Sequence, residues 1–250
     1  MVTEVEAPVL EPPYVNGVAL TGVRKAFGDV VALDGVDLRL GAGELVAVVG
    51  PSGCGKSTLL ELVCGLTEAD AGSVAAPPAA LMPQRDGLLP WLSALDNAAL
   101  ALRVAGTSRA AARAAAHEHF AAFGLDGFEH ARPAALSGGM RQRVAFIRTL
   151  LAGRPLLCLD EPFASLDALT RAQAQTWLGE ALAREPRTVL LVTHDVEEAV
   201  LLADRIVLLS PRPGRVVLEL AVELPRSRVR TDAAVVALRE RALSALGVTE

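Results

Sequence analysis

Short runs of apolar residues, separated by polar or glycine-containing turns, recur along most of this chain of 250 residues. Continuous apolar runs rich in valine and leucine predict strands that are buried on both faces of a sheet. We predict strands at residues 18–23, 36–40, 44–49, 79–82, 156–159, 188–193 and 205–209. A further run at residues 215–222 follows a proline- and glycine-containing turn, and we predict an edge strand there.

The pattern changes between residues 93 and 132, where Ala, Arg, Glu and Leu dominate and β-branched residues are few. This composition favours helix, and we predict a helical subdomain inserted into the sheet domain. Further helices are expected at residues 58–66 and 232–246. Because buried strands alternate with helical segments, the chain is predicted to be an α/β protein with a largely parallel sheet.

The composition is that of a globular protein, with 52% hydrophobic and 21% charged residues. The length fits one large domain, or one domain with an inserted subdomain. No stretch approaches the roughly 18 uninterrupted apolar residues of a membrane-spanning helix, so any work at a membrane is expected to go through a partner. Residues 1–16 lack a basic-then-apolar pattern, and we expect a flexible leader rather than a signal peptide.

Charge and cysteine content narrow the class of protein a little further. The net charge of -5 gives no general attraction to nucleic acid, although a local basic patch would still be compatible with it. We therefore expect no nucleic-acid partner. The three cysteines show no metal-like pair spacing, which indicates free thiols in a reducing compartment.

The first chemical motif is a phosphate-binding loop. Residues 50–57 match the pattern G-x-x-x-x-G-K-[ST], directly after a predicted strand and before a predicted helix. Glycines in such a loop let backbone N–H groups point at phosphate oxygens. Lys56 would neutralise the β- and γ-phosphates, and the Ser57 hydroxyl would bind Mg²⁺. The expected nucleotide-binding residues here are Gly50, Pro51, Ser52, Gly53, Cys54, Gly55, Lys56, Ser57 and Thr58.

A pair of carboxylates ends the predicted strand at residues 156–159. That position puts Asp160 at the carboxyl edge of the sheet, beside the phosphate loop. Asp160 would hold Mg²⁺ through water, and Glu161 would act as general base toward the water that attacks the γ-phosphate. Alone, two acidic residues after an apolar run usually mark the start of a solvated loop. Because a phosphate loop lies upstream, we instead favour a role for both residues at the phosphate site.

The third motif is the sequence Leu-Ser-Gly-Gly at residues 136–139. A serine and two glycines at a helix start offer a hydroxyl, N–H groups and a positive dipole end to an anion. In isolation a plain helix N-cap is the simpler interpretation. Between the phosphate loop and Asp160, however, the motif resembles the signature of ABC ATPases, and the resemblance extends over about residues 18–218.

The resemblance implies a fold and a division of the chain. The expected fold is a P-loop NTPase with a RecA-like mixed or parallel sheet core, an antiparallel β subdomain and an inserted α-helical subdomain. The ATPase domain would cover residues 17–224, with the helical subdomain at about 88–152, and a short helical extension would cover residues 225–250. No large C-terminal regulatory domain is expected.

The resemblance also assigns roles to single residues. Phe27 resembles the aromatic residue that stacks on adenine, the alternative being a core phenylalanine. Gln84 resembles the glutamine that senses Mg²⁺ and links the site to a permease. Asp167 lies in a segment, residues 164–167, that resembles the loop crossing between subunits. His194 resembles the switch histidine that contacts the γ-phosphate, a role that rests on the surrounding motifs, because a lone histidine after a strand is more often structural.

These roles give an expected set of site residues. The catalytic ones are Lys56, Gln84, Glu161 and His194, and the Mg²⁺ site comprises Ser57, Gln84 and Asp160. Besides the phosphate loop, the nucleotide would contact Phe27, Ser137, Gly138, Gly139 and Asp167. Three other histidines, His117, His119 and His130, are expected at the surface. The signature has Met140 where many members have glutamine, and residues 164–165 read Ala-Ser where Ser-Ala is commoner; neither change removes a phosphate donor or a carboxylate.

The resemblance further implies partners and a place of action. In such ATPases the signature of one subunit closes over ATP held by the phosphate loop of the other, because neither half alone surrounds the γ-phosphate with donors. We therefore expect an ATP-sandwiched homodimer with ATP and Mg²⁺ as cofactors. It would energise an integral-membrane permease from the cytoplasmic face as a peripheral protein. An extracytoplasmic solute-binding protein would act indirectly.

Residues 84–91, 160–163, 169–171 and 210–214 resemble the nitrate/sulfonate/taurine group of importers. Importers of thiamine-precursor pyrimidines share much of this pattern, and the ATPase sequence does not name the cargo. Residues 88–91 are apolar, and two arrangements are open. They either fold back onto the helical insert or receive a short cytoplasmic helix of the permease with Trp91 as anchor.

Three rival functions are weaker. A DNA-maintenance or ribosome-associated relative would have a long coiled-coil insert or two motors, whereas only about 80 residues separate Lys56 from Ser137. A small-molecule kinase would have no use for the signature or for His194. An inactive subunit is disfavoured because Lys56, Asp160, Glu161 and His194 are all present.

Overall fold

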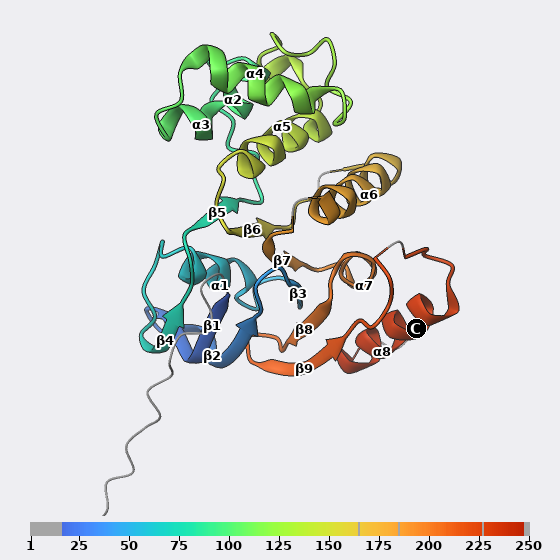
Figure 1. Cartoon of the computed structure of the whole chain (residues 1–250). Coiled ribbons are helices and arrows are strands. Elements are labelled where there is room, and N and C mark those ends of the chain that lie inside the picture. Colours follow the sequence, from blue (N-terminus) through green and yellow to red (C-terminus); the bar gives the residue numbers. More distant parts are fainter. Residues whose placement is uncertain (1–16, 165, 185, 227, 248–250) are drawn as a thin grey trace, which may run out of the picture.

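The computed structural model describes residues 17–164, 166–184, 186–226 and 228–247. The expected leader at residues 1–16, Ser165 of the expected crossing loop and the last three residues of the expected extension lie outside this set. Within it the strands form two sheets (Figure 1). The smaller one is antiparallel with the order β2-β1-β4, made by β1 (Val18–Phe27), β2 (Val30–Leu40) and β4 (Ala71–Ala75).

The larger sheet has the order β5-β6-β7-β3-β8-β9. Its strands are β3 (Leu45–Val49), β5 (Ala79–Met82), β6 (Leu156–Asp160), β7 (Thr188–Thr193), β8 (Arg205–Leu209) and β9 (Val216–Ala221). All neighbours are parallel except β8 and β9, so the predicted largely parallel sheet and its edge strand are confirmed.

Alternation along β3 explains why every residue of that strand is buried. Leu45, Ala47 and Val49 face a core that includes buried apolar residues of helices between positions 94 and 242. Val46 and Val48 face a second core, which includes β1, β2 and the helix after the phosphate loop. Since successive side chains of a strand point to opposite faces, a continuous apolar run is what a doubly covered strand requires.

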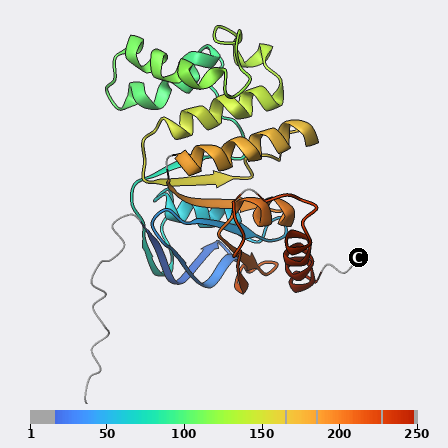
Figure 2. The ribbon, with the colours of Figure 1, turned by 45° about the vertical axis from the view of Figure 1, so that its right-hand side comes forward.

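The helices divide into groups (Figures 1 and 2). Helix α1 (Lys56–Val63) follows the phosphate loop. A helical group extends past β5 and β6 and comprises α2 (Ala94–Ala98), α3 (Leu100–Val104), α4 (Arg109–Phe120), the 3₁₀ turn Pro133–Ala135 and α5 (Gly138–Leu150). In both views α6 (Ala168–Arg184) lies between this group and the sheet. The remaining helices are α7 (Val196–Leu202) and α8 (Ala233–Ala245).

Sequence patterns located some elements and missed others. The strands predicted at 79–82, 188–193 and 205–209 have those bounds. β1 and β2 are longer than predicted, and α1 begins at Lys56 rather than at residue 58. β4 was missed because none of its residues is buried, so it lacks an apolar signal and is held by its pairing with β1.

The C-terminal segment is part of the main core. Val235 and Ala242 of α8 are buried in it. Arg228 donates through one guanidinium nitrogen to the carbonyls of Val200 (2.9 Å) and Ala203 (2.6 Å). These carbonyls lie at the end of α7, where helix geometry leaves acceptors without partners, so Arg228 acts as a cap of that helix.

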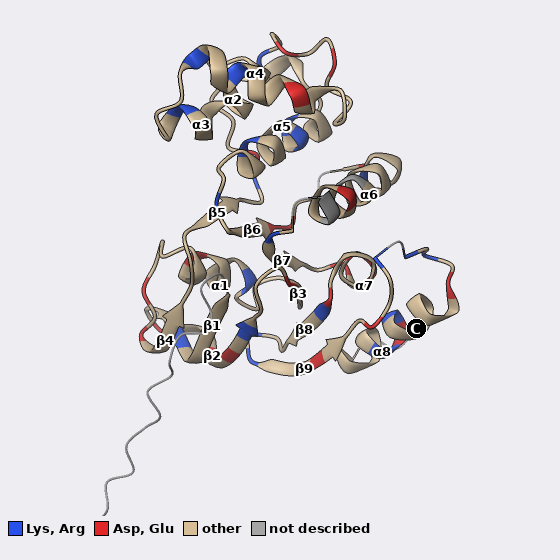
Figure 3. Ribbon diagram, viewed as in Figure 1, with Lys and Arg blue, Asp and Glu red and all other residues tan. Residues whose placement is uncertain are grey.

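Charged residues of both signs are interspersed over the sheets and the helices (Figure 3). The longest described helices are too short or too polar to cross a lipid bilayer.

Candidate active site

Three predicted motifs meet at one edge of the larger sheet. β3, β7 and β6 lie side by side, with Val49 paired to Thr193 and Asp160 paired to Val192. The phosphate loop follows β3, Glu161 follows β6 and His194 follows β7. Because the carboxyl ends of parallel strands share an edge, Lys56 and Glu161 converge on one site although they are 105 positions apart in the sequence.

The phosphate loop wraps tightly around its own lysine. Gly55 has φ +104°, and a Cβ there would lie 2.8 Å from the carbonyl oxygen of Ala32, so only glycine fits. Lys56 is buried, and its Nζ donates to the carbonyls of Gly50 (2.8 Å) and Pro51 (3.1 Å). The loop thus holds a cation next to the free N–H groups that open α1, which is an arrangement suited to phosphate.

Glu161 is the point where three predicted residues meet. Its Oε2 atom lies 3.1 Å from Nδ1 of His194 and 3.3 Å from Nε2 of Gln84. The Glu161 side chain is largely shielded, whereas that of His194 is 57% exposed. Glu161 has φ +46°, a left-handed conformation that is unfavourable for this residue type, and its N–H donates to the carbonyl of Val192 at 2.9 Å. The carboxylate thus lies between Gln84 and His194, and Glu161 lines one cavity with the phosphate loop.

Asp160 and Ser57 place side-chain oxygens beside the loop. Burial raises the pKa of Asp160, nearby Glu161 raises it further, and a hydrogen bond with the Ser57 hydroxyl opposes the shift. Among the described residues, no group of three or more His, Cys, Asp or Glu side chains is arranged so that it could hold a metal ion by itself. One carboxylate and one hydroxyl fit an ion such as Mg²⁺, which keeps waters and takes its remaining ligands from a nucleotide's phosphates.

The phosphate loop, Gln84 and Glu161 line a cavity of about 520 Å³, whereas Asp160 and His194 are not among its lining residues. Its lining is Phe27, Val30, Ala32, Ser52, Gly53, Gly55, Lys56, Ser57, Thr58, Gln84, Glu161 and Arg212. Phe27 is 51% exposed, so the alternative that it is a core residue is wrong. Val30, Ala32 and Arg212 were not predicted, because the β1–β2 hairpin and the β8–β9 loop reach the cavity only through tertiary packing. A family resemblance had drawn attention to residues 210–214, but not as part of the site.

The remaining predicted nucleotide contacts lie outside this cavity. The side chain of Cys54 points into the core, and burial raises the pKa of its thiol. Ser137 caps α5 by accepting from the N–H of Met140 at 3.2 Å. Asp167 caps α6 by accepting from the N–H of Thr170 at 3.0 Å, and hydrogen bonds from Thr170 lower the pKa of its carboxyl. These two caps order the start of each helix.

The predicted signature and the predicted crossing loop contact each other. A Cβ on Gly139 would lie 3.1 Å from Cδ2 of Leu166 and 3.6 Å from Cγ2 of Thr170. The predicted site residues of one chain therefore fall into two groups. One lines the cavity at the phosphate loop, and the other joins the starts of α5 and α6.

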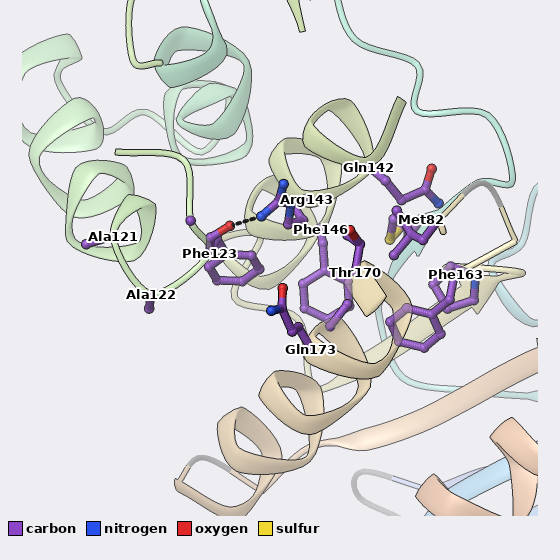
Figure 4. A pocket seen from close by; sticks show the side chains of 14 residues that line it. Met82, Ala121, Ala122, Phe123, Gln142, Arg143, Phe146, Phe163, Thr170 and Gln173 are labelled. Atoms are coloured by element: carbon purple, nitrogen blue, oxygen red, sulfur yellow. Dashed lines mark hydrogen bonds between the residues drawn. The ribbon is translucent and has the colours of Figure 1, made fainter. Parts of the chain in front are cut away.

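A second cavity, of about 340 Å³, separates α5 from α6 (Figure 4). The rings of Phe123, Phe146 and Phe163 lie along it, and Arg143 donates to the carbonyl of Phe123 at 2.6 Å. None of the described residues that line it is acidic, and it does not include the phosphate loop. It is an apolar space between helices rather than a second site for phosphate chemistry.

Comparison with known proteins decides the family. The sequence profile of the ABC transporter family matches residues 33–164, which contain the phosphate loop, the signature and both carboxylates. The chain belongs to the ABC transporter family. It is an ATPase of that family, with the α/β fold of the ABC cassette, and the predicted fold class and nucleotide binding are confirmed.

Curated relatives of this ABC ATPase match over most of its length. The aliphatic sulfonates import ATP-binding protein SsuB 1 of Nocardia farcinica is 46% identical, covering 92% of each chain. The SsuB 2 protein of Pseudomonas aeruginosa is 47% identical, covering 90% of this chain and 83% of that one. The taurine import ATP-binding protein TauB of Escherichia coli is 43% identical, covering 87% and 92%.

Solved cassettes share the fold. The dimeric post-hydrolysis structure of an ATP-binding cassette bound to ADP and Pi superposes on this ABC ATPase with a TM-score of 0.75 and 29% identity. The match covers 83% of this chain and the whole of the other.

Proposed function

We propose that this ABC ATPase hydrolyses ATP in the cavity at the phosphate loop, with Glu161 as general base. The observation that carries the proposal is the meeting of Gln84 and His194 on one oxygen of Glu161, at 3.3 and 3.1 Å. A shielded carboxylate that accepts a hydrogen bond from Gln84 and lies against His194 is suited to accepting a proton from water. The water oxygen then bonds to the γ-phosphorus, the bond from that phosphorus to the bridging oxygen breaks, and ADP leaves.

The other cavity residues bind and orient the nucleotide. Phe27 stacks on adenine from the edge of the β1–β2 hairpin. The N–H groups at the start of α1 bind phosphate oxygens, and Lys56 balances their charge. His194, exposed and next to Glu161, contacts the γ-phosphate. Ser57, Asp160 and Gln84 hold Mg²⁺, which when bound neutralises charge on the phosphates.

The active form is a homodimer in which each cavity is completed by the partner's signature. Ser137, Gly138 and Gly139 do not line the cavity of their own chain. The Ser137 hydroxyl accepts from the N–H of Met140 and can still donate its own proton, so a helix start with this serine and two glycines suits phosphate. The solved cassettes with this fold are described as dimeric. Cysteines placed at Ser52 and Ser137 are expected to crosslink between chains only when ATP is bound; crosslinking within single chains would contradict the shared site.

We also propose the division of the chain that the sequence predicts. Residues 17–224 would be the ATPase domain, with about 88–152 as its helical subdomain, and residues 225–250 would be an extension. Trp91 is 66% exposed next to buried Leu88, so the apolar run after Gln84 is partly core and partly surface. We propose that its exposed part docks an integral-membrane permease at the cytoplasmic face of the membrane, and that an extracytoplasmic solute-binding protein delivers the cargo.

The cargo we propose is a small sulfonate, such as an alkanesulfonate or taurine. Support comes from relatives that are 43–47% identical over about nine-tenths of the chain and named for aliphatic sulfonate or taurine import. Nitrate and pyrimidine import remain the alternatives from the residues alone.

Growth of a deletion strain tests the cargo. Loss of the gene should abolish growth on sulfonates as sole sulfur source, with growth on sulfate unchanged. The wild-type gene should restore growth, and a Lys56→Ala copy, matched in expression, should not. A defect only on nitrate, or only without added thiamine, would contradict the sulfonate assignment.

A further inference from the structure

The loop between β8 and β9, residues 210–215, joins the phosphate loop to the β1–β2 hairpin. The N–H of Gly214 donates to the carbonyl of Ala32 at 2.9 Å, and the carbonyl of Gly214 accepts from the N–H of Asp34 at 3.1 Å. On the other side, a Cβ at Gly214 would lie 2.1 Å from the carbonyl oxygen of Cys54. Only glycine permits this approach, so the β8–β9 loop is wedged between β2 and the phosphate loop.

Arg212 extends from this loop across the phosphate loop. Its Nε donates to the carbonyl of Gly53 at 2.9 Å. A Cβ on Gly53 would lie 2.9 Å from a terminal nitrogen of the same guanidinium, so the guanidinium lies against the glycine. Gly53 has φ +78°, a conformation that favours glycine in any case. Gly53 thus makes room for the arginine, and Gly214 lets the loop that carries the arginine approach the phosphate loop.

The guanidinium keeps donors for a ligand. A guanidinium has five N–H groups, and the described contacts of Arg212 use the Nε–H alone. No carboxylate in the described part of the chain pairs with it, whereas Arg215 of the same loop forms an ion pair with Asp34. Arg212 is exposed and lines the nucleotide cavity.

Charge in the cavity favours an anion at this point. Lys56 is the other cation of the lining, and its Nζ is shared with two carbonyls of its own loop. A nucleotide brings several negative charges to this loop, and arginine matches phosphate oxygens with two parallel donors. The alternative is that Arg212 only holds Gly53 in place by its hydrogen bond and does not contact the nucleotide.

We propose that Arg212 binds the phosphate chain of the nucleotide directly, as a second cation beside Lys56, with Gly53 fixing its position. The proposal rests on the proposed nucleotide site. It makes residues 210–214 part of the binding site rather than a connection between strands.

Nucleotide binding by the purified full chain tests the proposal. Kd for ATP, ADP and adenosine is measured by calorimetry for the wild type, Arg212→Gln, Arg212→Lys and the control Arg215→Gln, alongside the melting temperature of each. Arg212→Gln should weaken ATP and ADP about tenfold, the effect of one charged hydrogen bond, and leave adenosine unchanged. Arg212→Lys keeps the positive charge but loses the two parallel donors of the guanidinium, so its affinity for ATP and ADP should lie between those of the wild type and Arg212→Gln. Arg215→Gln should bind all three ligands as the wild type does.

Each other outcome overturns a defined claim. Unchanged ATP affinity in Arg212→Gln overturns the proposal. An equal loss of affinity for ATP and adenosine would also overturn it, because Arg212 would then only hold Gly53 in place or contact the base. If Arg212→Gln does not fold, Arg212→Lys decides. Wild-type affinity of folded Arg212→Lys for ATP and ADP would mean that the two parallel donors of the guanidinium do not bind phosphate. A wild-type chain that binds no ATP, or a Lys56→Ala variant that binds it normally, would instead overturn the proposed nucleotide site.

Discussion

The carboxylate of Asp86 accepts a hydrogen bond from Nε of Arg141 at 2.9 Å. This contact ties the segment that follows Gln84 to α5, the helix that Ser137 begins. A second nitrogen of Arg141 donates to the carbonyl of Leu136, the first residue of the signature, at 2.9 Å. Arg148 of the same helix donates to the carbonyl of Asp86 at 2.7 Å. Within one chain, the segment of Gln84, which contacts Glu161, is thus linked to the signature, which is proposed to face the partner's nucleotide.

Asp86→Asn is therefore expected to lower kcat more than it changes ATP affinity. We predict a roughly two- to thirtyfold loss of kcat, the range of coupling effects of 0.5–2 kcal/mol, with Kd for ATP within about twofold. Steady-state kinetics and calorimetry separate the two. The exposed Asp126→Asn is the control, and the double exchange Asp86→Arg with Arg141→Asp should recover part of kcat. An equal loss of affinity and kcat would mean that the pair only stabilises the fold.

Trp91 and Leu88 provide a matched pair in one loop. Leu88 is buried and Trp91 is exposed, while Asn97 holds the loop by accepting from the N–H of Leu89 at 2.7 Å. Leu88→Ala should destabilise the chain by about 2–5 kcal/mol, as expected of a core truncation. Trp91→Ala should leave melting temperature and basal ATPase activity unchanged but weaken permease binding by about 2 kcal/mol or more, as loss of an aromatic anchor does.

Pull-down of detergent-solubilised permease by each variant measures the predicted loss of permease binding. Unchanged permease binding by a folded Trp91→Ala protein would place the docking surface elsewhere. A large drop in melting temperature in that variant would make Trp91 part of the core.

Glu198 predicts how stability depends on pH. It is buried in α7, where burial above all raises the pKa of its carboxyl to about 8, with nearby Asp195 adding to the shift. The folded state then holds a proton that the unfolded state has released, between the unfolded pKa of about 4.3 and the folded value. Stability from this group is full below the unfolded pKa and is lost as pH rises through the folded one, with a slope of at most about 1.4 kcal/mol per pH unit.

Glu198→Gln should remove this slope. Urea unfolding at pH 5 to 8.5 is the measurement, with Glu197→Gln, a neighbour whose side chain is 29% exposed, as the control. The wild type and the control should both lose stability toward pH 8.5, and Glu198→Gln should lose less. Parallel curves for all three would mean that Glu198 is ionised in the fold.

The sequence was sufficient where chemistry is local. The phosphate loop, the two carboxylates after β6 and His194 after β7 are each contiguous motifs, and parallel strand order brings them together without further information. Arg212 shows the limit. Its role depends on the packing of the β8–β9 loop against Gly53, and no local pattern marks that contact. β4 shows a second limit, since a strand held by one pairing partner and exposed on both faces has no apolar signature.

Breaks inside the helical stretch were also invisible to composition. Residues 93–132 favour helix throughout, yet Ser93 and Ser108 cap separate helices by accepting from the N–H groups of Asp96 (3.1 Å) and Ala111 (3.3 Å). Caps compete with continuation of a helix, and their positions are set by packing on α5 as much as by residue type.

Glu161→Gln tests the central claim, that a carboxylate oriented by Gln84 and His194 activates water for attack on ATP. The substitution keeps the shape and removes the base. ATP binding should stay within about threefold of the wild type, while single-turnover hydrolysis should fall by roughly 10²–10⁴-fold, the usual contribution of a general base. The variant should also elute as an ATP-dependent dimer in gel filtration. Wild-type hydrolysis by a folded, ATP-binding Glu161→Gln protein would contradict the account.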